Sequence, residues 1–185
     1  MYQIRILVRG RPGIGKSTVV ERVFDILSSR RLKTGGIMSP EIREQGVRTG
    51  FKIIDLLSGE EGILAHINQK DGPRIGKYRV NLEDLEAVGA HAIEKGIKQA
   101  NWLLIDEIGK MELFSKAFQK AVIRAFDSEK PILAVIPQRY YHPTLEDIKK
   151  RMNLKIYEVT LNNRKYLPEK ISREILSVLK GDRDG

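Results

Sequence analysis

Residues 10–17 of this 185-residue chain read Gly10-Arg11-Pro12-Gly13-Ile14-Gly15-Lys16-Ser17, and this stretch decides the fold class. It fits the pattern G-x-x-x-x-G-K-[ST], in which a glycine-rich turn between a strand and a helix holds phosphate groups with main-chain amides. An apolar segment at residues 4–8 precedes the turn, and apolar residues recur at helical spacing over residues 19–27. The chain is therefore expected to open as a strand, a phosphate-binding loop (P-loop) and a helix.

The residues of the P-loop have distinct expected tasks. Its glycines let the main chain curl closely around phosphate oxygens, and the start of the next helix adds the positive end of its dipole. Lys16 is expected to reach the β- and γ-phosphates and to take part in catalysis, while the Ser17 hydroxyl is expected to ligate Mg²⁺. Thr18 also fits an ordinary helix position. The expected nucleotide-binding residues here are Gly10, Arg11, Pro12, Gly13, Ile14, Gly15, Lys16, Ser17 and Thr18.

Two adjacent acids follow a second apolar segment, Trp102-Leu103-Leu104-Ile105-Asp106-Glu107. Ligands of parallel sheets bind at the carboxyl ends of the strands, so these acids are expected to face the crevice that holds the P-loop. Asp106 would hold Mg²⁺ directly or through a water molecule. Glu107 would orient or deprotonate the attacking water and act with Lys16 in catalysis. Acids also follow strands as plain surface residues, and the P-loop is what favours the catalytic interpretation.

Strand-like and helical segments alternate along most of the chain, which predicts an α/β fold with a mostly parallel sheet and helices on both faces. Residues 34–80 differ, because glycines punctuate short β-prone pieces there, and we expect a β-rich insertion over the phosphate site. After Asn81, an expected helix N-cap, the predicted order is helix, strand 102–105, helix 114–125, strand 132–136, helix 144–151, strand 155–160 and helix 171–179. A single domain is expected over residues 1–185, with a disordered tail at residues 181–185.

Two further pairs of polar residues follow predicted strands. Gln138 and Arg139 come after the strand at 132–136, where a side chain could touch the γ-phosphate or its water. Asn163 and Arg164 come after the last strand and are expected to bind nucleotide, through the base or by adding positive charge to the transition state. Such an arginine can accelerate phosphoryl transfer by about 10³- to 10⁵-fold, so a site without one would turn over slowly. Each pair equally fits exposed loop residues.

Composition excludes several classes of protein. The chain has no cysteine, which excludes disulfides and cysteine-ligated zinc, and its three histidines show no metal-binding pattern. No apolar run reaches the roughly 18 residues of a membrane-spanning helix and no signal peptide is recognisable, so a cytoplasmic protein without membrane partners is expected. The net charge of +9 suits nucleotide phosphates and equally RNA or DNA. Because no aromatic-rich basic motif accompanies this charge, a nucleic-acid partner stays open but unsupported.

The stretch Asp106-Glu107-Ile108-Gly109-Lys110-Met111-Glu112-Leu113-Phe114-Ser115 resembles a known family, the small P-loop nucleoside triphosphatases of thermophiles that also include the vertebrate cancer-related nucleoside-triphosphatase. The resemblance extends over nearly the whole chain, through the P-loop, Gly50-Phe51, Gly76-Lys77-Tyr78, Ile136-Pro137 and Asn163-Arg164. It implies Mg²⁺-dependent hydrolysis of ATP, GTP and other nucleoside triphosphates to diphosphate and phosphate, with broad base preference, on a fold similar to small nucleotide kinases. It also implies the roles given above to Asp106 and Glu107, and it assigns none to Arg139.

Two other functions stay open on the sequence. A nucleotide or small-molecule kinase of similar fold would pass the phosphate to an acceptor, although no arginine-rich lid is recognisable. A nucleic-acid-binding switch would use the nucleotide site for regulation, and its affinity would fall steeply with salt. In each case the expected partners are nucleoside triphosphates, and the protein is expected to act as a monomer.

Overall fold

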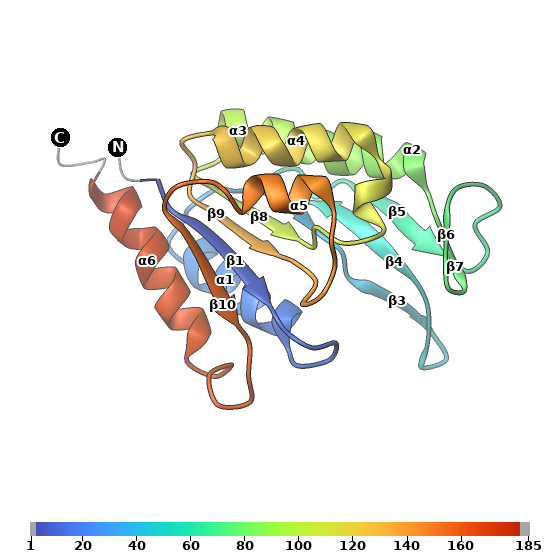
Figure 1. Ribbon diagram of the computed structural model, residues 1–185, viewed down its shortest axis with the longest axis horizontal. Helices are drawn as coiled ribbons and strands as arrows, with labels where there is room; N and C mark the ends of the chain where they lie inside the picture. The colour runs from blue at the N-terminus through green and yellow to red at the C-terminus, as the bar shows by residue number, and fades with distance from the viewer. Residues whose placement is uncertain (1–2, 182–185) are drawn as a thin grey trace.

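The buried apolar segments form a parallel sheet in the computed structural model, which describes residues 3–181 (Figure 1). The strands of this part lie in the order β10 (Leu154–Glu158), β1 (Arg5–Arg9), β9 (Ile132–Val135), β8 (Trp102–Asp106) and β2 (Thr34–Met38). Each strand pairs with its neighbours in parallel. The central strands β8 and β9 are buried along their whole length, because helices cover both faces, and they therefore read as continuous apolar runs. The predicted α/β fold with a parallel sheet is confirmed.

An antiparallel extension continues the same sheet beyond β2. Its strands follow in the order β4 (Val47–Asp55), β5 (Glu61–His66), β7 (Tyr78–Val80) and β6 (Arg74–Ile75), and β3 (Glu41–Glu44) pairs with β4. The predicted β-rich insertion is present, but its expected start was wrong, because residues 34–38 form β2 and pair in parallel with β8. Because Gly35 and Gly36 are typical of turns, the sequence pattern did not indicate a core strand here. They are required there, since a Cβ atom on Gly35 would lie 2.4 Å from the Cα of Gly96.

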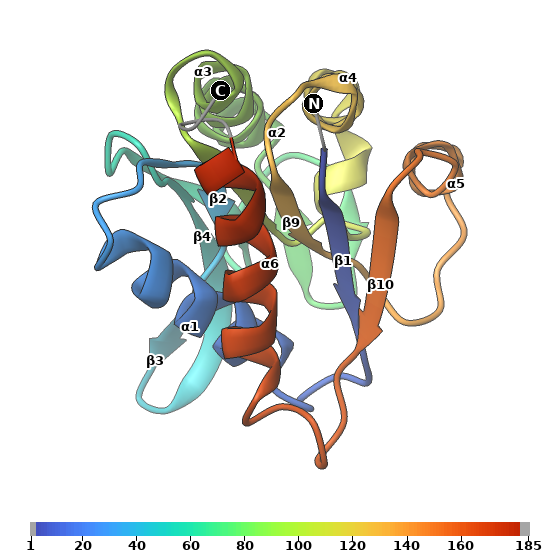
Figure 2. The same cartoon turned by 90° about the vertical axis from the view of Figure 1, so that its left-hand side faces the viewer.

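Helices cover the sheet on two sides (Figures 1 and 2). On one face, α1 (Lys16–Ser28) and α6 (Leu167–Gly181) enclose a core with one side of the parallel strands. The other face packs against α2 (Leu82–Asp84), a π-helical turn η1 (Leu85–Ala90), α3 (His91–Gln99), α4 (Lys116–Asp127) and α5 (Pro143–Ile148). Successive residues of each parallel strand point alternately into these two cores. The carboxyl ends of the strands remain available for the candidate active site described below.

Caps set where the helices begin. The Asn81 side chain accepts a hydrogen bond from the Asp84 amide, which confirms the predicted N-cap. Ser115 caps α4 in the same way through the Phe118 amide, so the helix begins after Phe114 and not at it. Phe114 instead ends a short 3-10 turn, η2 (Glu112–Phe114), and is exposed. Of the tail that was expected to be disordered, Gly181 ends α6 and residues 182–185 lie outside the described part. Over the described residues, no helix is long and apolar enough to cross a membrane.

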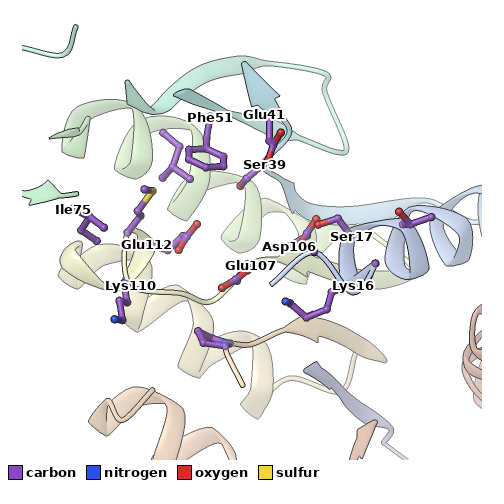
Figure 3. Close-up of a pocket in the computed structure, with 16 residues that line it drawn as sticks. Lys16, Ser17, Ser39, Glu41, Phe51, Ile75, Asp106, Glu107, Lys110 and Glu112 are labelled. Carbon is purple, nitrogen blue, oxygen red and sulfur yellow. The ribbon is translucent and has the colours of Figure 1, made fainter. Parts of the chain in front are cut away.

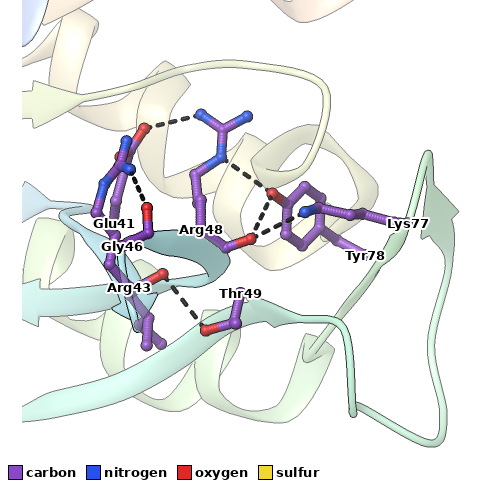
Figure 4. A network of polar contacts seen from close by, with 8 residues as sticks. Glu41, Arg43, Gly46, Arg48, Thr49, Lys77 and Tyr78 are labelled. Atoms are coloured by element: carbon purple, nitrogen blue, oxygen red, sulfur yellow. Dashed lines mark hydrogen bonds and ion pairs between the residues drawn. The ribbon is translucent and has the colours of Figure 1, made fainter.

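Charged and aromatic side chains tie β3, β4 and β7 into one wall (Figure 4). Arg48 Nη1 donates to Glu41 Oε1 over 2.8 Å, and Arg48 Nε donates to the Tyr78 hydroxyl over 3.0 Å. Lys77 Nζ donates to the Arg48 carbonyl, and the Arg48 guanidinium lies 5.2 Å from the centre of the Phe51 ring. The hydrogen bond from Arg48 also holds the pKa of Glu41 below its usual value. This wall forms one side of the cavity described below.

A buried ion pair fastens the extension to the helical layer. Asp55, 1% exposed, accepts hydrogen bonds of 2.6 Å from both Lys95 Nζ and the Ser58 hydroxyl. Burial opposes ionisation of Asp55, but these hydrogen bonds outweigh it and hold its pKa below 3.8. Asp55→Asn is therefore expected to lower the free energy of unfolding at neutral pH by about 2–4 kcal/mol, because Lys95 loses its charged partner.

The same ion pair predicts a dependence on pH. The stabilisation by Asp55 is fully present above its unfolded-state pKa and is lost as the pH falls through the lowered folded-state pKa. Urea unfolding at neutral pH and at about pH 3 should therefore show a smaller difference between wild type and Asp55→Asn in acid. The exposed ion pair between Lys52 and Glu61 supplies the control. Glu61→Gln removes the charged partner of Lys52 and should lower the free energy of unfolding by less than about 1 kcal/mol at either pH. A difference for Asp55→Asn that does not change with pH would contradict this account.

Candidate active site

The P-loop joins β1 to the first turn of α1. Gly13 and Gly15 have φ angles of 75° and 110°, in the left-handed region that glycine adopts without strain. Among the described residues no side chain caps α1, so its first amide donors are left for a ligand. Lys16 Nζ donates to the carbonyls of Gly10 and Arg11 over 2.9 and 3.2 Å, which holds the ammonium group across the loop.

The strand order brings the two predicted acids to the P-loop. Asp106 ends β8, two strands from β1, and lies close to the Ser17 side chain. Glu107 follows directly, and both acids line the same cavity as Lys16 and Ser17 (Figure 3). The arrangement on which the sequence hypothesis depended is therefore present in the fold.

Burial gives these acids unusual proton affinities. It raises the pKa of Asp106 to about 7, assisted by the negative charges of Glu107 and Glu21, while the polar Ser17 side chain and the Lys16 charge act in the opposite direction. Burial also raises the pKa of Glu107, and Lys16 lowers it. The acidic end of the site is thus short of positive charge, and a cation bound there would favour the ionised carboxylates.

The residues present suit Mg²⁺. The Ser17 hydroxyl and the Asp106 carboxylate are hard oxygen donors, and Mg²⁺ commonly takes one or two protein ligands and completes its shell with phosphate oxygens and water. Over residues 3–181, no group of three or more His, Cys, Asp or Glu side chains is placed to enclose a metal ion. A magnesium ion held here would therefore depend on the phosphates of a nucleotide.

The cavity has a volume of about 590 Å³ and two ends of different chemistry. The phosphate end is lined by Gly13, Gly15, Lys16, Ser17, Thr18, Asp106, Glu107 and Pro137. The far end lies against the antiparallel extension and is lined by Ser39, Glu41, Phe51, Leu64, Ile75, Lys110, Met111 and Glu112. Thr18 thus lies in the cavity with the residues of the P-loop, and no arginine of residues 3–181 lines this cavity.

Sequence reasoning missed the four polar residues of the far end, Ser39, Glu41, Lys110 and Glu112. The Ser39 hydroxyl is buried and has no hydrogen-bond partner among the described residues. Ser39 follows β2, whose last residue, Met38, pairs with Asp106, so recognition of residues 34–38 as a parallel strand would have found it. Glu112 is 5% exposed, and its sequence signal was an acid between two apolar residues.

Several predicted residues lie outside this cavity. Arg11, Ile14 and Gln138 line a second depression of about 510 Å³, together with residues 158–162 at the end of β10 and after it. Gln138 Nε2 donates to Glu158 Oε1 there over 2.9 Å. Arg139 is exposed and lines neither space. The structure therefore does not bring Gln138 or Arg139 to the position expected for the γ-phosphate.

Asn163 and Arg164 brace the loops around the P-loop. Asn163 accepts a hydrogen bond from the Thr160 amide over 2.8 Å and donates to the Glu158 carbonyl over 2.7 Å, which closes the turn after β10. Arg164 Nη1 donates to the Ile14 carbonyl over 3.3 Å. Both side chains are thus used within the protein, and Arg164 contacts the P-loop at Ile14.

Comparison with solved structures identifies the same fold elsewhere. The crystal structure of THEP1 from the hyperthermophile Aquifex aeolicus matches with a TM-score of 0.78 and 31% identity over 91% of this chain and 96% of that one. The solution structure of a human cancer-related nucleoside triphosphatase matches with a TM-score of 0.79 and 30% identity over 94% and 98%. The expected P-loop NTPase fold is therefore confirmed.

Comparison with known sequences agrees with the structural matches. A nucleoside-triphosphatase THEP1 from Thermofilum pendens is 49% identical over 174 residues, 94% of this chain and 96% of the relative. The corresponding protein from Methanosarcina acetivorans is 44% identical over 95% of this chain and 99% of its own. The profile of the NTPase family matches residues 5–172. With the P-loop and the paired acids in one cavity, these matches establish that the chain belongs to the NTPase family.

Proposed function

We propose that this protein hydrolyses nucleoside triphosphates, ATP and GTP among them, to diphosphate and phosphate with the help of Mg²⁺. The observation that supports this most directly is the meeting of Lys16, Ser17, Asp106 and Glu107 at one end of a single cavity. The relatives named above carry the name nucleoside-triphosphatase, in agreement. Residues 1–185 are proposed to form a single P-loop NTPase domain.

Each residue at the phosphate end has a separate task in this reaction. The amides of the P-loop and the Lys16 ammonium bind the β- and γ-phosphates. Ser17 and Asp106 would hold Mg²⁺, which supplies positive charge to the phosphate oxygens. Glu107 accepts a proton from water as the water oxygen bonds to the γ-phosphorus, and the bond to the β-phosphate oxygen breaks with its electron pair left on the diphosphate.

Turnover is expected to be slow. An arginine next to the transferred phosphate accelerates such reactions by about 10³- to 10⁵-fold, and no arginine of residues 3–181 lines the cavity. Arg164 is held against the Ile14 carbonyl. Of the two lysines that line the cavity, Lys16 lies at the phosphate end, and it is the one proposed to meet the γ-phosphate.

The second depression supports a site for the base or ribose. It adjoins the P-loop at Arg11 and Ile14 and is closed by the turn that Asn163 holds. In this proposal Asn163 and Arg164 shape the nucleotide site without needing to touch the base. A site made of one loop against the P-loop agrees with the broad base preference that the family resemblance implies.

The kinase alternative is not favoured, because the relatives carry the name of hydrolases. The sequence-based expectations of a cytoplasmic location and a monomer stay predictions.

A panel of triphosphates tests the proposal. Phosphate release from ATP, GTP, CTP and UTP should all be measurable, should fall to background when EDTA removes Mg²⁺, and should return when Mg²⁺ is restored. Release that is indifferent to EDTA would contradict the metal role. Consumption of ATP that depends on added acceptors, such as nucleoside monophosphates, with phosphate recovered on the acceptor would replace the hydrolase by a kinase.

A further inference from the structure

The far end of the cavity has the make-up of a small-molecule site, and the hydrolysis proposed above gives it no task. Its apolar walls come from Phe51, Leu64, Ile75 and Met111. Figure 3 shows Phe51, Ile75 and Glu112 around one space. Pockets for small ligands are lined mainly by apolar and aromatic side chains, with a few polar groups that fix the orientation of the ligand. The far end fits this description.

The Phe51 ring is held in place at one wall of this space. The Tyr78 ring packs against it edge-on, with the ring centres 5.4 Å apart. The Arg48 guanidinium lies 5.2 Å from the centre of the Phe51 ring and donates to the Tyr78 hydroxyl. Phe51 also lines the cavity, so part of its surface remains open to it. A ring that is already fixed can bind an aromatic group without losing further side-chain freedom.

Two polar side chains of the far end can accept hydrogen bonds from a ligand. The Ser39 hydroxyl oxygen is buried and has no hydrogen-bond partner within residues 3–181. Glu112 accepts a hydrogen bond from the Gly109 amide through Oε2, and a carboxyl group can accept more than one. Buried polar groups normally have a partner, so the unpaired Ser39 hydroxyl at the cavity wall indicates a place for a ligand or a water molecule. A ligand with O–H or N–H donors would satisfy both side chains.

The other charged side chains of this end already have partners. Glu41 is paired with Arg48 over 2.8 Å. The Lys110 ammonium lies 5.3 Å from the centre of the Tyr140 ring. We therefore expect this end to select a ligand by its shape and its hydrogen bonds and not by its charge.

A ligand at the far end would lie next to the proposed chemistry. A Cβ atom on Gly109 would lie 2.7 Å from Glu107 Oε1 and 3.1 Å from Glu112 Oε2, so these two carboxyl groups meet where the two ends of the cavity join. The second depression, proposed above for the base or ribose, instead adjoins the P-loop at Arg11 and Ile14. The far end is thus left free when a nucleotide occupies the P-loop and that depression.

We propose that the far end binds a second small molecule at the same time as the nucleoside triphosphate. The ligand is an uncharged compound with an aromatic ring to pack on Phe51 and a hydroxyl or amide donor for Ser39 and Glu112. It fills space through which water reaches Glu107, so its binding slows hydrolysis. The binding is independent of the proposed function, and the effect on the rate rests on it.

Methionine methyl groups report the binding directly. The carbon-13 methyl signal of Met111, assigned by its absence in Met111→Leu, should shift to saturation on titration with millimolar benzyl alcohol or benzamide. The shift should occur without nucleotide and also with Mg²⁺ and a non-hydrolysable ATP analogue at saturation. Met152, which is 81% exposed and outside the cavity, should not respond. Benzyl methyl ether keeps the ring but has no donor, and its affinity should be about three- to tenfold lower than that of benzyl alcohol.

Three variants identify the groups that hold the probe. Phe51→Leu keeps an apolar wall but loses the ring, and the affinity for benzyl alcohol should fall by about three- to tenfold. Ser39→Ala should weaken benzyl alcohol by a similar factor and leave the ether unaffected. Because the Ser39 hydroxyl has no partner within the described chain, this variant should unfold at no lower temperature than the wild type. Tyr141→Ala, an aromatic residue 76% exposed outside the cavity, is the control and should bind as the wild type does.

Two results of the titration would overturn the proposal. One is the absence of a saturable Met111 shift with both probes. The other is displacement of the probes by the ATP analogue, which would assign the far end to the nucleotide.

Steady-state kinetics test the effect on the rate. Saturating benzyl alcohol should lower kcat for phosphate release by about threefold or more, with KM for ATP within about twofold, because the ligand affects water and not nucleotide binding. An unchanged kcat with the probe bound would overturn the link to hydrolysis. If the protein releases no phosphate, the proposed function fails, and the Met111 titration still decides whether the second ligand binds.

Discussion

Glu107→Gln is expected to reduce phosphate release from ATP by about 10²- to 10⁴-fold, which is the usual contribution of a general base. Glutamine has nearly the same shape but cannot accept the proton of the attacking water. Binding of ATP should persist, because the P-loop and Lys16 are unchanged. Single-turnover phosphate release measures the first effect, and calorimetric titration with ATP and Mg²⁺ measures the second.

The same substitution at another glutamate separates the loss of the general base from a nonspecific loss of activity. Glu94 lies on α3, pairs with Arg124, and is remote from the phosphate end of the cavity. Glu94→Gln should leave the rate of release within about twofold of wild type, as expected for a surface ion pair. If Glu107→Gln bound ATP and still released phosphate at the wild-type rate, Glu107 would not be the base.

Gly36→Ala is expected to have the largest effect on stability. Gly36 lies in β2 with a φ angle of 97°, and a Cβ atom there would lie 2.1 Å from the Leu104 carbonyl oxygen in β8. The left-handed conformation and the overpacking each cost about 1–3 kcal/mol, a large part of the stability of a typical domain. Urea unfolding should show a large fall in midpoint, or no folded protein at all.

Gly59 supplies the control for the conformational part of this cost. It has a similar left-handed φ of 76°, but a Cβ atom there would meet nothing within 4 Å. Gly59→Ala should therefore cost about 1–2 kcal/mol and leave a folded protein. Equal effects of the two substitutions would contradict the proposed clash with β8. A large effect at Gly36 alone would also explain why β2 has a glycine at this position.

The phosphate end of the site was predictable because its chemistry is local. The residues from Gly10 to Ser17 are adjacent in sequence and share one turn, so their spacing alone indicates phosphate binding. Asp106 and Glu107 needed a single further rule, that the ends of parallel strands lie at one edge of the sheet. Lys16, Ser17 and both acids accordingly line one cavity.

The sequence was less informative about the roles of polar residues in the loops that follow strands. Gln138 bonds to Glu158 and lines the second depression, and Asn163 uses its side chain to close a turn. A polar side chain after a strand can form hydrogen bonds with several neighbouring protein groups or with a ligand, and the sequence does not indicate which of them it chooses. Phe114 shows the same limit at a helix start, where the Ser115 cap moved the boundary by two residues.

By itself, the sequence determined the α/β architecture, the P-loop and the identity of the two acids, because each depends on a periodicity or a spacing between neighbours along the chain. Tertiary structure alone decided that residues 34–38 are a core strand. The glycines there are required because Gly96 and Leu104, from distant segments of the chain, pack too closely for a Cβ atom. It also decided that Ser39 and Glu112 line the far end of the same cavity. Burial and the charge of Glu107 set the proton affinity of Glu112, and both exist only after the chain has folded.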